Sequence, residues 1–277
     1  MHLLSINDLT NIQILRIFDL ADEIKSRPHY YGNTLVDKVL GSLFFQPSTR
    51  TRGSFESAMY KLNGKVISVV GTENTSMEKG ETLVDTIHMW QNYADILVLR
   101  TREEDLSFIN KFNTPLINAG NGYNEHPTQA LIDFYTIQQI LGGISHHNII
   151  ICGDILYSRA IHSFMELAVR LENNFFLVPS TTYLPLSLTK FPYTSNDPTK
   201  FNQAFNTNLD TVAYIQTYER LDIPYIIYIV RPQRTTTMLE RVDIYESISG
   251  GSHVGIYPQL TDKAIELFNN PVILHPL

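Results

Sequence analysis

Short apolar runs alternate along the chain with segments in which apolar residues recur every three or four positions. A continuous apolar run of about four to eight residues is typical of a strand buried on both faces, whereas the second spacing is typical of a helix with one buried face. The predicted strands are residues 39–45, 65–70, 96–99, 115–118, 148–152, 175–178, 225–230 and 272–274. The predicted helices run from Ser5 to the residue before Pro28, surround Phe55–Leu62, and cover residues 83–90, 127–141, 159–171 and 262–268.

This alternation of strands and helices predicts parallel sheets covered by helices. The length of 277 residues corresponds to roughly two domains. The long helix over residues 127–141, which starts with a proline and is followed by two glycines, is expected to join them. We therefore expect an α/β protein with two domains, residues 1–130 and residues 131–277, each a parallel sheet flanked by helices. Residues 181–210 are rich in Thr, Ser, Pro and Asn and predict a long loop in the second domain.

Composition narrows the classes of partner. The formal net charge of −7 argues against nucleic-acid binding, so an anionic ligand must be met by local clusters of Arg and Lys. No apolar run approaches the roughly 18 residues of a membrane helix, and no signal peptide is visible. The single cysteine, Cys152, fits a reducing compartment, and the pair His146-His147 has no carboxylate or thiol at ligand spacing. We expect a cytoplasmic protein that binds no membrane, nucleic acid or metal.

The first candidate site is Ser48-Thr49-Arg50-Thr51-Arg52, which follows a predicted strand and begins a helix. In open parallel sheets, ligands bind in the loops beyond the carboxyl ends of the strands. Backbone N–H groups at a helix start, hydroxyls and a guanidinium group together suit a phosphate or another oxyanion. An ordinary capped helix with surface arginines explains the same residues equally well.

Other predicted strand ends carry polar side chains of the same kind. A histidine at a helix N-terminus tends to stay neutral and can donate a hydrogen bond to a carbonyl oxygen. A guanidinium group can bind a carboxylate through two hydrogen bonds, and a neighbouring amide can support it. Each residue taken alone is also explained as ordinary surface polarity. These residues are Arg100, His126, Gln129, Arg159, His162, Arg231 and Gln233.

As a set, the motifs resemble the aspartate/ornithine carbamoyltransferase family, in order from the first helix to the last residue. The motifs that carry the resemblance are residues 44–52, residues 74–82, His126-Pro127-Thr128-Gln129, Gly153-Asp154 with Tyr157, Arg159 and His162, Arg231-Pro232-Gln233, and His275-Pro276-Leu277. The last two favour the catalytic chains that act on aspartate, because a cationic acceptor site suits a dicarboxylic acid and repels ornithine.

The resemblance implies transfer of the carbamoyl group from carbamoyl phosphate to the amino group of L-aspartate, giving N-carbamoyl-L-aspartate and phosphate, in pyrimidine biosynthesis and without a cofactor. The residues that it assigns to the phosphate are Ser48, Thr49, Arg50 and Thr51. Thr51, Arg100 and His126 would surround the carbamoyl oxygen, and Gln129 would bind the amide nitrogen. Among these, Arg50, Thr51, Arg100 and His126 are the implied catalytic residues.

The resemblance also implies an acceptor site and an assembly. The residues implied to bind aspartate are Arg159, Arg231, Gln233 and the backbone carbonyl of Leu277. Ser76 and Lys79 would enter the active site of a neighbouring subunit, which implies a homotrimer with shared active sites. Regulatory chains are further candidate partners.

Several positions depart from the family pattern. Gln46 stands where the family usually has Glu, and Leu156 and Ser158 replace a basic or polar residue and a Gly. The family also continues past the His-Pro-Leu motif into a long C-terminal helix, which the second domain is expected to lack. Two alternatives therefore stay open: a carbamoyltransferase with another amino acceptor, and a truncated relative without catalysis.

Overall fold

The structure is a computed structural model that describes residues 1–73, 75–153, 158–179, 226–230 and 273–274. Two compact units divide the chain, residues 1–131 and residues 132–276, and the division falls within helix α5 (Pro127–Leu141). Each unit contains a four-stranded parallel sheet. The predicted α/β class, with parallel sheets flanked by helices, is confirmed. The predicted helix over residues 262–268 and the predicted loop over residues 181–210 lie outside the described residues.

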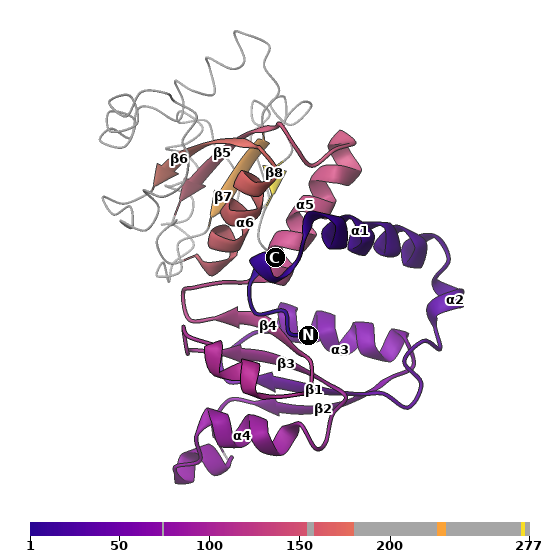
Figure 1. Cartoon of the computed structure of the whole chain (residues 1–277), viewed down its shortest axis with the longest axis vertical. Coiled ribbons are helices and arrows are strands. Elements are labelled where there is room, and N and C mark those ends of the chain that lie inside the picture. The colour runs from indigo at the N-terminus through magenta and orange to yellow at the C-terminus, as the bar shows by residue number, and fades with distance from the viewer. Residues whose placement is uncertain (74, 154–157, 180–225, 231–272, 275–277) are drawn as a thin grey trace. The chain divides into compact units, whose positions relative to one another are not determined.

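The first sheet has the strand order β2-β1-β3-β4. Its strands are β1 (Val39–Phe44), β2 (Lys65–Val70), β3 (Ile96–Thr101) and β4 (Leu116–Asn121). The helices that precede α5 are α1 (Asn11–Ser26), α2 (Pro28–Tyr31), α3 (Arg50–Lys61) and α4 (Leu83–Trp90), with short 3-10 turns η1 (Ile6–Asp8), η2 (Ser76–Lys79) and η3 (Ser107–Lys111). Helices α3 and α4 lie on opposite sides of the sheet (Figure 1).

Two apolar clusters fill the space on the two faces of this sheet. Met59 of α3 packs with Leu40 and Phe44 of β1 on one face. Ile87 of α4 packs with Leu43 of β1 on the other face. Successive side chains of a strand point to opposite faces, so β1 must be apolar at nearly every position, which is the continuous run seen in the sequence.

The tight fit of this core explains the glycine inside strand β1. A Cβ atom built on Gly41 would lie 2.5 Å from Leu97 Cδ2 and 3.2 Å from the ring of Trp90. Any side chain at this position would therefore displace the packing between the strand and α4.

The second sheet has the order β6-β5-β7-β8. Its strands are β5 (Asn148–Gly153), β6 (Asn174–Pro179), β7 (Ile226–Val230) and β8 (Ile273–Leu274). Helix α6 (Arg159–Arg170) buries one apolar face, and Phe164 of this helix stacks on Phe134 of α5 with ring centroids 4.8 Å apart. In the described part of the chain, no helix combines the length and the apolar character that crossing a bilayer requires.

The start of the chain differs from the sequence prediction of one long helix from Ser5. Ser5 and Asp8 do form a capping box, but it caps only the 3-10 turn η1. A second capping box, formed by Thr10 and Gln13, starts α1 at Asn11. The prediction was wrong because two capping signals follow one another within six residues, and the first one belongs to a turn that does not continue.

Candidate active site

The carboxyl ends of β1, β3 and β4 lie next to one another in the first sheet, because these three strands are neighbours. The segments that leave them carry the predicted site residues: residues 45–50 after β1, Arg100 at the end of β3, and residues 122–129 after β4. Loops at this edge of a parallel sheet are where ligands bind in such folds.

The segment after β1 leads into the exposed start of helix α3. Thr49 precedes the helix with φ −80° and ψ −50°, and its side chain makes no capping hydrogen bond. The first N–H groups of the helix are therefore not capped by Thr49 and remain suited to an anion. Ser48 and Thr51 are half-buried beside this start, while Thr49 and Arg50 are exposed.

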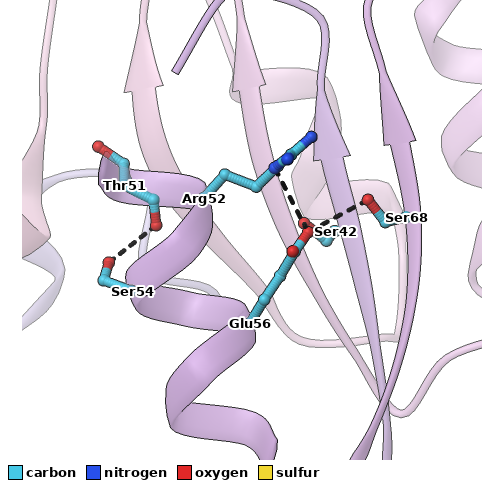
Figure 2. A network of polar contacts seen from close by, with 6 residues as sticks. All are labelled: Ser42, Thr51, Arg52, Ser54, Glu56 and Ser68. Carbon is cyan, nitrogen blue, oxygen red and sulfur yellow. Dashed lines mark hydrogen bonds and ion pairs between the residues drawn. The ribbon is translucent and has the colours of Figure 1, made fainter. Parts of the chain in front are cut away.

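Glu56 anchors the same helix to the sheet. Its Oε1 accepts hydrogen bonds from Ser42 Oγ of β1 at 2.8 Å and Ser68 Oγ of β2 at 3.1 Å (Figure 2). Arg52 Nε lies 3.8 Å from the same oxygen, one helical turn before Glu56. Because one carboxylate joins two strands to the helix, it fixes how the first turn of α3, with Arg50 and Thr51, is presented. Glu56 was not among the residues predicted from the sequence, although its i,i+4 spacing from Arg52 was a usable signal.

Arg100 is a half-buried cation close to a second cation. Its Nη1 donates to the carbonyl oxygen of Ala119 at 3.3 Å, and its buried Nε has no hydrogen-bond partner within the described structure. Burial, and then repulsion by the nearby Arg50 guanidinium, lowers the pKa of Arg100 to about 10. Among the described residues, neither arginine forms an ion pair with a carboxylate. Two neighbouring guanidinium groups without an acid between them favour an anionic ligand.

A change of register between β3 and β4 occurs beside Arg100. Leu99 pairs with Asn118 and Thr101 with Asn121, so one extra residue of β4 is accommodated in between. Such bulges re-aim side chains, and they are frequent near active sites. Here the bulge places the carbonyl oxygen of Ala119 within reach of Arg100.

His126 and Gln129 belong to the start of α5, which follows β4. Both side chains are buried, with exposed fractions of 7% and 5%. Thr128 Oγ1 lies 3.3 Å from His126 Nδ1, and the Gln129 N–H donates to the His126 carbonyl oxygen at 3.0 Å. The role of His126 and Gln129 in binding the carbamoyl group stays a prediction.

Ser76 and Lys79 lie on η2, in the segment that follows β2. Both side chains are exposed, and no hydrogen bond or ion pair within the described residues joins them to Arg50, Arg100 or His126. The turn is held by Thr75, whose Oγ1 accepts the Met77 N–H, and it ends at Gly80 with φ 97°. The assignment of Ser76 and Lys79 to the active site of a neighbouring subunit stays a prediction.

The expected acceptor residues are only partly within the described structure. Arg159 is the first residue of α6 and is half-buried, and it follows the buried Ser158. Arg231, Gln233 and Leu277 lie outside the described residues, as do Leu156 and Tyr157. The aspartate site as a whole therefore stays a prediction. Within the described residues, no group of three or more His, Cys, Asp or Glu side chains could hold a metal ion.

Comparison with known proteins decides the family. A family model described as "Aspartate/ornithine carbamoyltransferase, carbamoyl-P binding domain" matches residues 1–139, half of the chain. The chain belongs to the aspartate/ornithine carbamoyltransferase family. The resemblance seen in the sequence is thereby confirmed, and the matched range contains every residue expected to bind carbamoyl phosphate.

Named family members match to different extents. An aspartate carbamoyltransferase catalytic subunit from Clostridium botulinum is 41% identical over 181 residues, which are 65% of this chain and 59% of that protein. One from Thermoplasma volcanium is 33% identical over 278 residues, which cover 99% of this chain and 85% of the relative. A similar fold is found in a crystal structure of aspartate transcarbamoylase from Trypanosoma cruzi in complex with carbamoyl phosphate and aspartate, with a TM-score of 0.72. The sequences are 26% identical, and the alignment covers 100% of this chain and 85% of the T. cruzi chain.

Proposed function

We propose that this family member transfers the carbamoyl group of carbamoyl phosphate to the amino group of L-aspartate, giving N-carbamoyl-L-aspartate and phosphate. The observation that carries the proposal is the pair of neighbouring guanidinium groups, Arg50 at the start of α3 and Arg100 at the end of β3. The T. cruzi relative, solved with carbamoyl phosphate and aspartate, supports the choice of substrates.

In this proposal the phosphate group of carbamoyl phosphate binds at the first turn of α3. The N–H groups of that turn and the hydroxyls of Ser48, Thr49 and Thr51 donate hydrogen bonds to it, and Arg50 supplies a full positive charge. The bound dianion also removes the repulsion between Arg50 and Arg100, so that the ligand and the two arginines stabilise one another.

The carbamoyl oxygen is held by Thr51, Arg100 and His126, and Gln129 binds the amide nitrogen. When the amine of aspartate attacks the carbamoyl carbon, negative charge develops on this oxygen, and fixed donors around it lower the barrier. The bond between the carbon and the phosphate oxygen then breaks. The departing phosphate takes the proton of the amine, so atoms and charge balance without a cofactor.

Aspartate is proposed to bind in the second unit, with Arg159 at its α-carboxylate and Arg231, Gln233 and the Leu277 carbonyl completing the site. The two substrates together carry roughly four negative charges, and an uncompensated buried charge costs several kcal/mol. Residues 1–130 thus hold carbamoyl phosphate and residues 131–277 hold the amino acid.

A homotrimer with shared active sites is part of the proposal. Strands of parallel sheets are normally covered on both faces. Edge strand β2 nevertheless exposes four of its six residues, with Ile67 and Val70 at 36% and 52% exposure. Packing of a second copy against this edge would also bring Ser76 and Lys79 of one subunit close to its neighbour.

Regulatory chains would be a further layer of the assembly. The single cysteine favours the cytoplasm, where the product would enter pyrimidine biosynthesis.

A carbamoyl-transfer assay tests the proposal. Purified full-length protein is mixed with carbamoyl phosphate and either L-aspartate or L-ornithine, and the ureido product is measured. We expect product from aspartate, with kcat/KM lowered at least about a hundredfold by Arg50→Gln. The control Arg102→Gln, which removes an exposed charge just after β3, should change kcat/KM less than about twofold. Product from ornithine or another amine alone would establish a different acceptor, and no product from any amine would establish the non-catalytic alternative.

A further inference from the structure

The turn that connects β4 to His126 is held by buried side chains in addition to its own backbone, in which the Asn121 N–H donates to the Glu125 carbonyl oxygen at 3.2 Å. Gly120 and Gly122, on either side of Asn121, have φ values of 105° and 48°, in the left-handed region that favours glycine. A Cβ atom at Gly122 would lie 2.5 Å from Glu104 Cγ. Glycine loses more conformational freedom on ordering than other residues do, so this turn needs external contacts to keep one conformation.

Asn121 supplies three of those contacts with one buried amide, which is 2% exposed. Its Oδ1 accepts from Asn118 Nδ2 at 2.8 Å and from the Glu125 N–H at 3.2 Å. Its Nδ2 donates to the Glu104 carbonyl oxygen at 2.7 Å. The side chain therefore adds a second hydrogen bond to the backbone one between Asn121 and Glu125, the residue directly before His126.

Asn118 and Glu125 tie the turn to the beginning of the chain. The Asn118 side chain is fully buried, and its Nδ2 donates to the Leu4 carbonyl oxygen at 2.8 Å while its Oδ1 accepts the Gly120 N–H at 2.8 Å. Glu125 Oε2 accepts the Ile6 N–H at 3.1 Å. Ile6 is itself fully buried in η1. The residue before His126 is thus bound on one side by Asn121 and on the other by the first turn of the chain.

We propose that Asn121 and Glu125 are positioning residues for His126. They act through the backbone of the turn and do not touch the substrate. This inference rests on the proposed function, in which His126 donates to the carbamoyl oxygen. A displacement of about 1 Å of such a donor can lower the rate up to about a hundredfold, so loosening the turn should slow the chemical step.

The decisive variant is Asn121→Ala, with Asn124→Ala as its matched control. Asn124 lies in the same turn and its Nδ2 donates to the same Glu104 carbonyl oxygen at 3.1 Å, but its side chain is exposed. In the full-length protein we expect Asn121→Ala to lower kcat for N-carbamoyl-aspartate formation by about ten- to a hundredfold. The KM for carbamoyl phosphate should change less than about threefold, because the phosphate contacts come from the segment after β1. Asn124→Ala should keep kcat within about twofold of the value for the unmodified protein.

A second pair of variants tests Glu125 by conservative replacement. Glu125→Gln keeps an oxygen that can accept the Ile6 N–H and should keep kcat within about threefold of the unmodified protein, whereas Glu125→Ala should lower kcat by about tenfold. Equal kcat values for these two variants would overturn the role of Glu125.

Amide hydrogen exchange provides a readout that does not depend on turnover. The backbone amides of a peptide that covers residues 121–130 should exchange faster in Asn121→Ala than in the unmodified protein. In Asn124→Ala, the exchange of the same amides should be unchanged. Unchanged exchange in Asn121→Ala, an unchanged kcat, or equal losses in Asn121→Ala and Asn124→Ala would overturn the positioning role. If the unmodified protein makes no N-carbamoyl-aspartate, the proposed function fails, and the exchange comparison alone decides whether Asn121 holds the turn.

Discussion

At the scale of single residues, the expected carbamoyl phosphate site contains two cations, Arg50 and Arg100, that form no ion pair with a carboxylate among the described residues. Arg100 is half-buried, it lies near Arg50, and its Nε has no hydrogen-bond partner within the described structure. Both burial and a like charge disfavour the protonated form, so the ligand-free protein holds this side chain at an energetic cost. Such a cost is typical of residues kept for binding, because an anionic ligand offsets it.

The lowered pKa of Arg100 predicts how phosphate affinity depends on pH. Arg100 carries its charge well below its pKa of about 10 and loses it as the pH rises through that value. Inorganic phosphate is already a dianion above about pH 8, so its own charge is constant there. We therefore expect phosphate affinity, measured by isothermal titration calorimetry, to fall as the pH approaches 10.

The matched variant for this prediction is Arg100→Gln. It should bind phosphate more weakly than the unmodified protein at pH 8 and show a smaller further loss toward pH 10. Parallel pH profiles for the two proteins would show that another group causes the dependence.

At the scale of elements, helix α3 depends on one carboxylate that joins it to two strands. Ser42 is fully buried and Ser68 is exposed, yet both donate to Glu56 Oε1. Burial makes a lost hydrogen bond more costly, because water cannot replace the missing partner.

The difference in burial between Ser42 and Ser68 predicts that replacing each with alanine has a different effect on stability. Ser42→Ala should lower the free energy of unfolding of the first unit by about 1–2 kcal/mol, and Ser68→Ala by less than about 0.5 kcal/mol. Thermal unfolding followed by circular dichroism measures both. Equal shifts in Tm would mean that Glu56 is not held in the way that Figure 2 shows.

The elements also show which information lies in local sequence. Strands β1 and β3 of the first sheet are mostly apolar, so their location could be predicted from the runs at residues 39–45 and 96–99 alone. The hydroxyl and guanidinium side chains after β1 could be recognised because they are consecutive. Local patterns failed where a turn and a helix were capped in succession, at Ser5 and Thr10.

The side-chain hydrogen bonds around His126 could not be predicted in the same way. Asn118 and Leu4 are 114 residues apart, and Glu125 and Ile6 are 119 residues apart. From the local sequence, an asparagine at the end of a strand predicts only a turn. Only the folded chain shows that Asn118 donates to the Leu4 carbonyl oxygen and to Asn121 in the turn before His126.

At the scale of the whole molecule, the proposed shared active site can be tested by mixing two inactive variants. Arg50→Ala removes a residue that a subunit uses itself, and Lys79→Ala removes one that it lends to its neighbour. If equal amounts are dissociated and reassembled at random into cyclic trimers, each mixed trimer contains one intact site, and about a quarter of all sites are intact.

We therefore expect roughly a quarter of the activity of the unmodified protein to return in the mixture. Each variant taken through the same procedure alone is the control. No recovered activity, in a sample shown by light scattering to contain trimers, would mean that Lys79 does not act in the neighbouring subunit.

The ties between the first turn of the chain and the turn before His126 also have a consequence during synthesis. Leu3 exchanges backbone hydrogen bonds with Leu116 and Asn118, and Ile6 is bound by Glu125. Leu3 and Ile6 therefore find their partners only when more than a hundred further residues have left the ribosome. Contacts of such long sequence separation are slow to form. We therefore expect residues 3–6 to be among the last parts of the first unit to reach their final place, and the turn that carries His126 to become fixed with them.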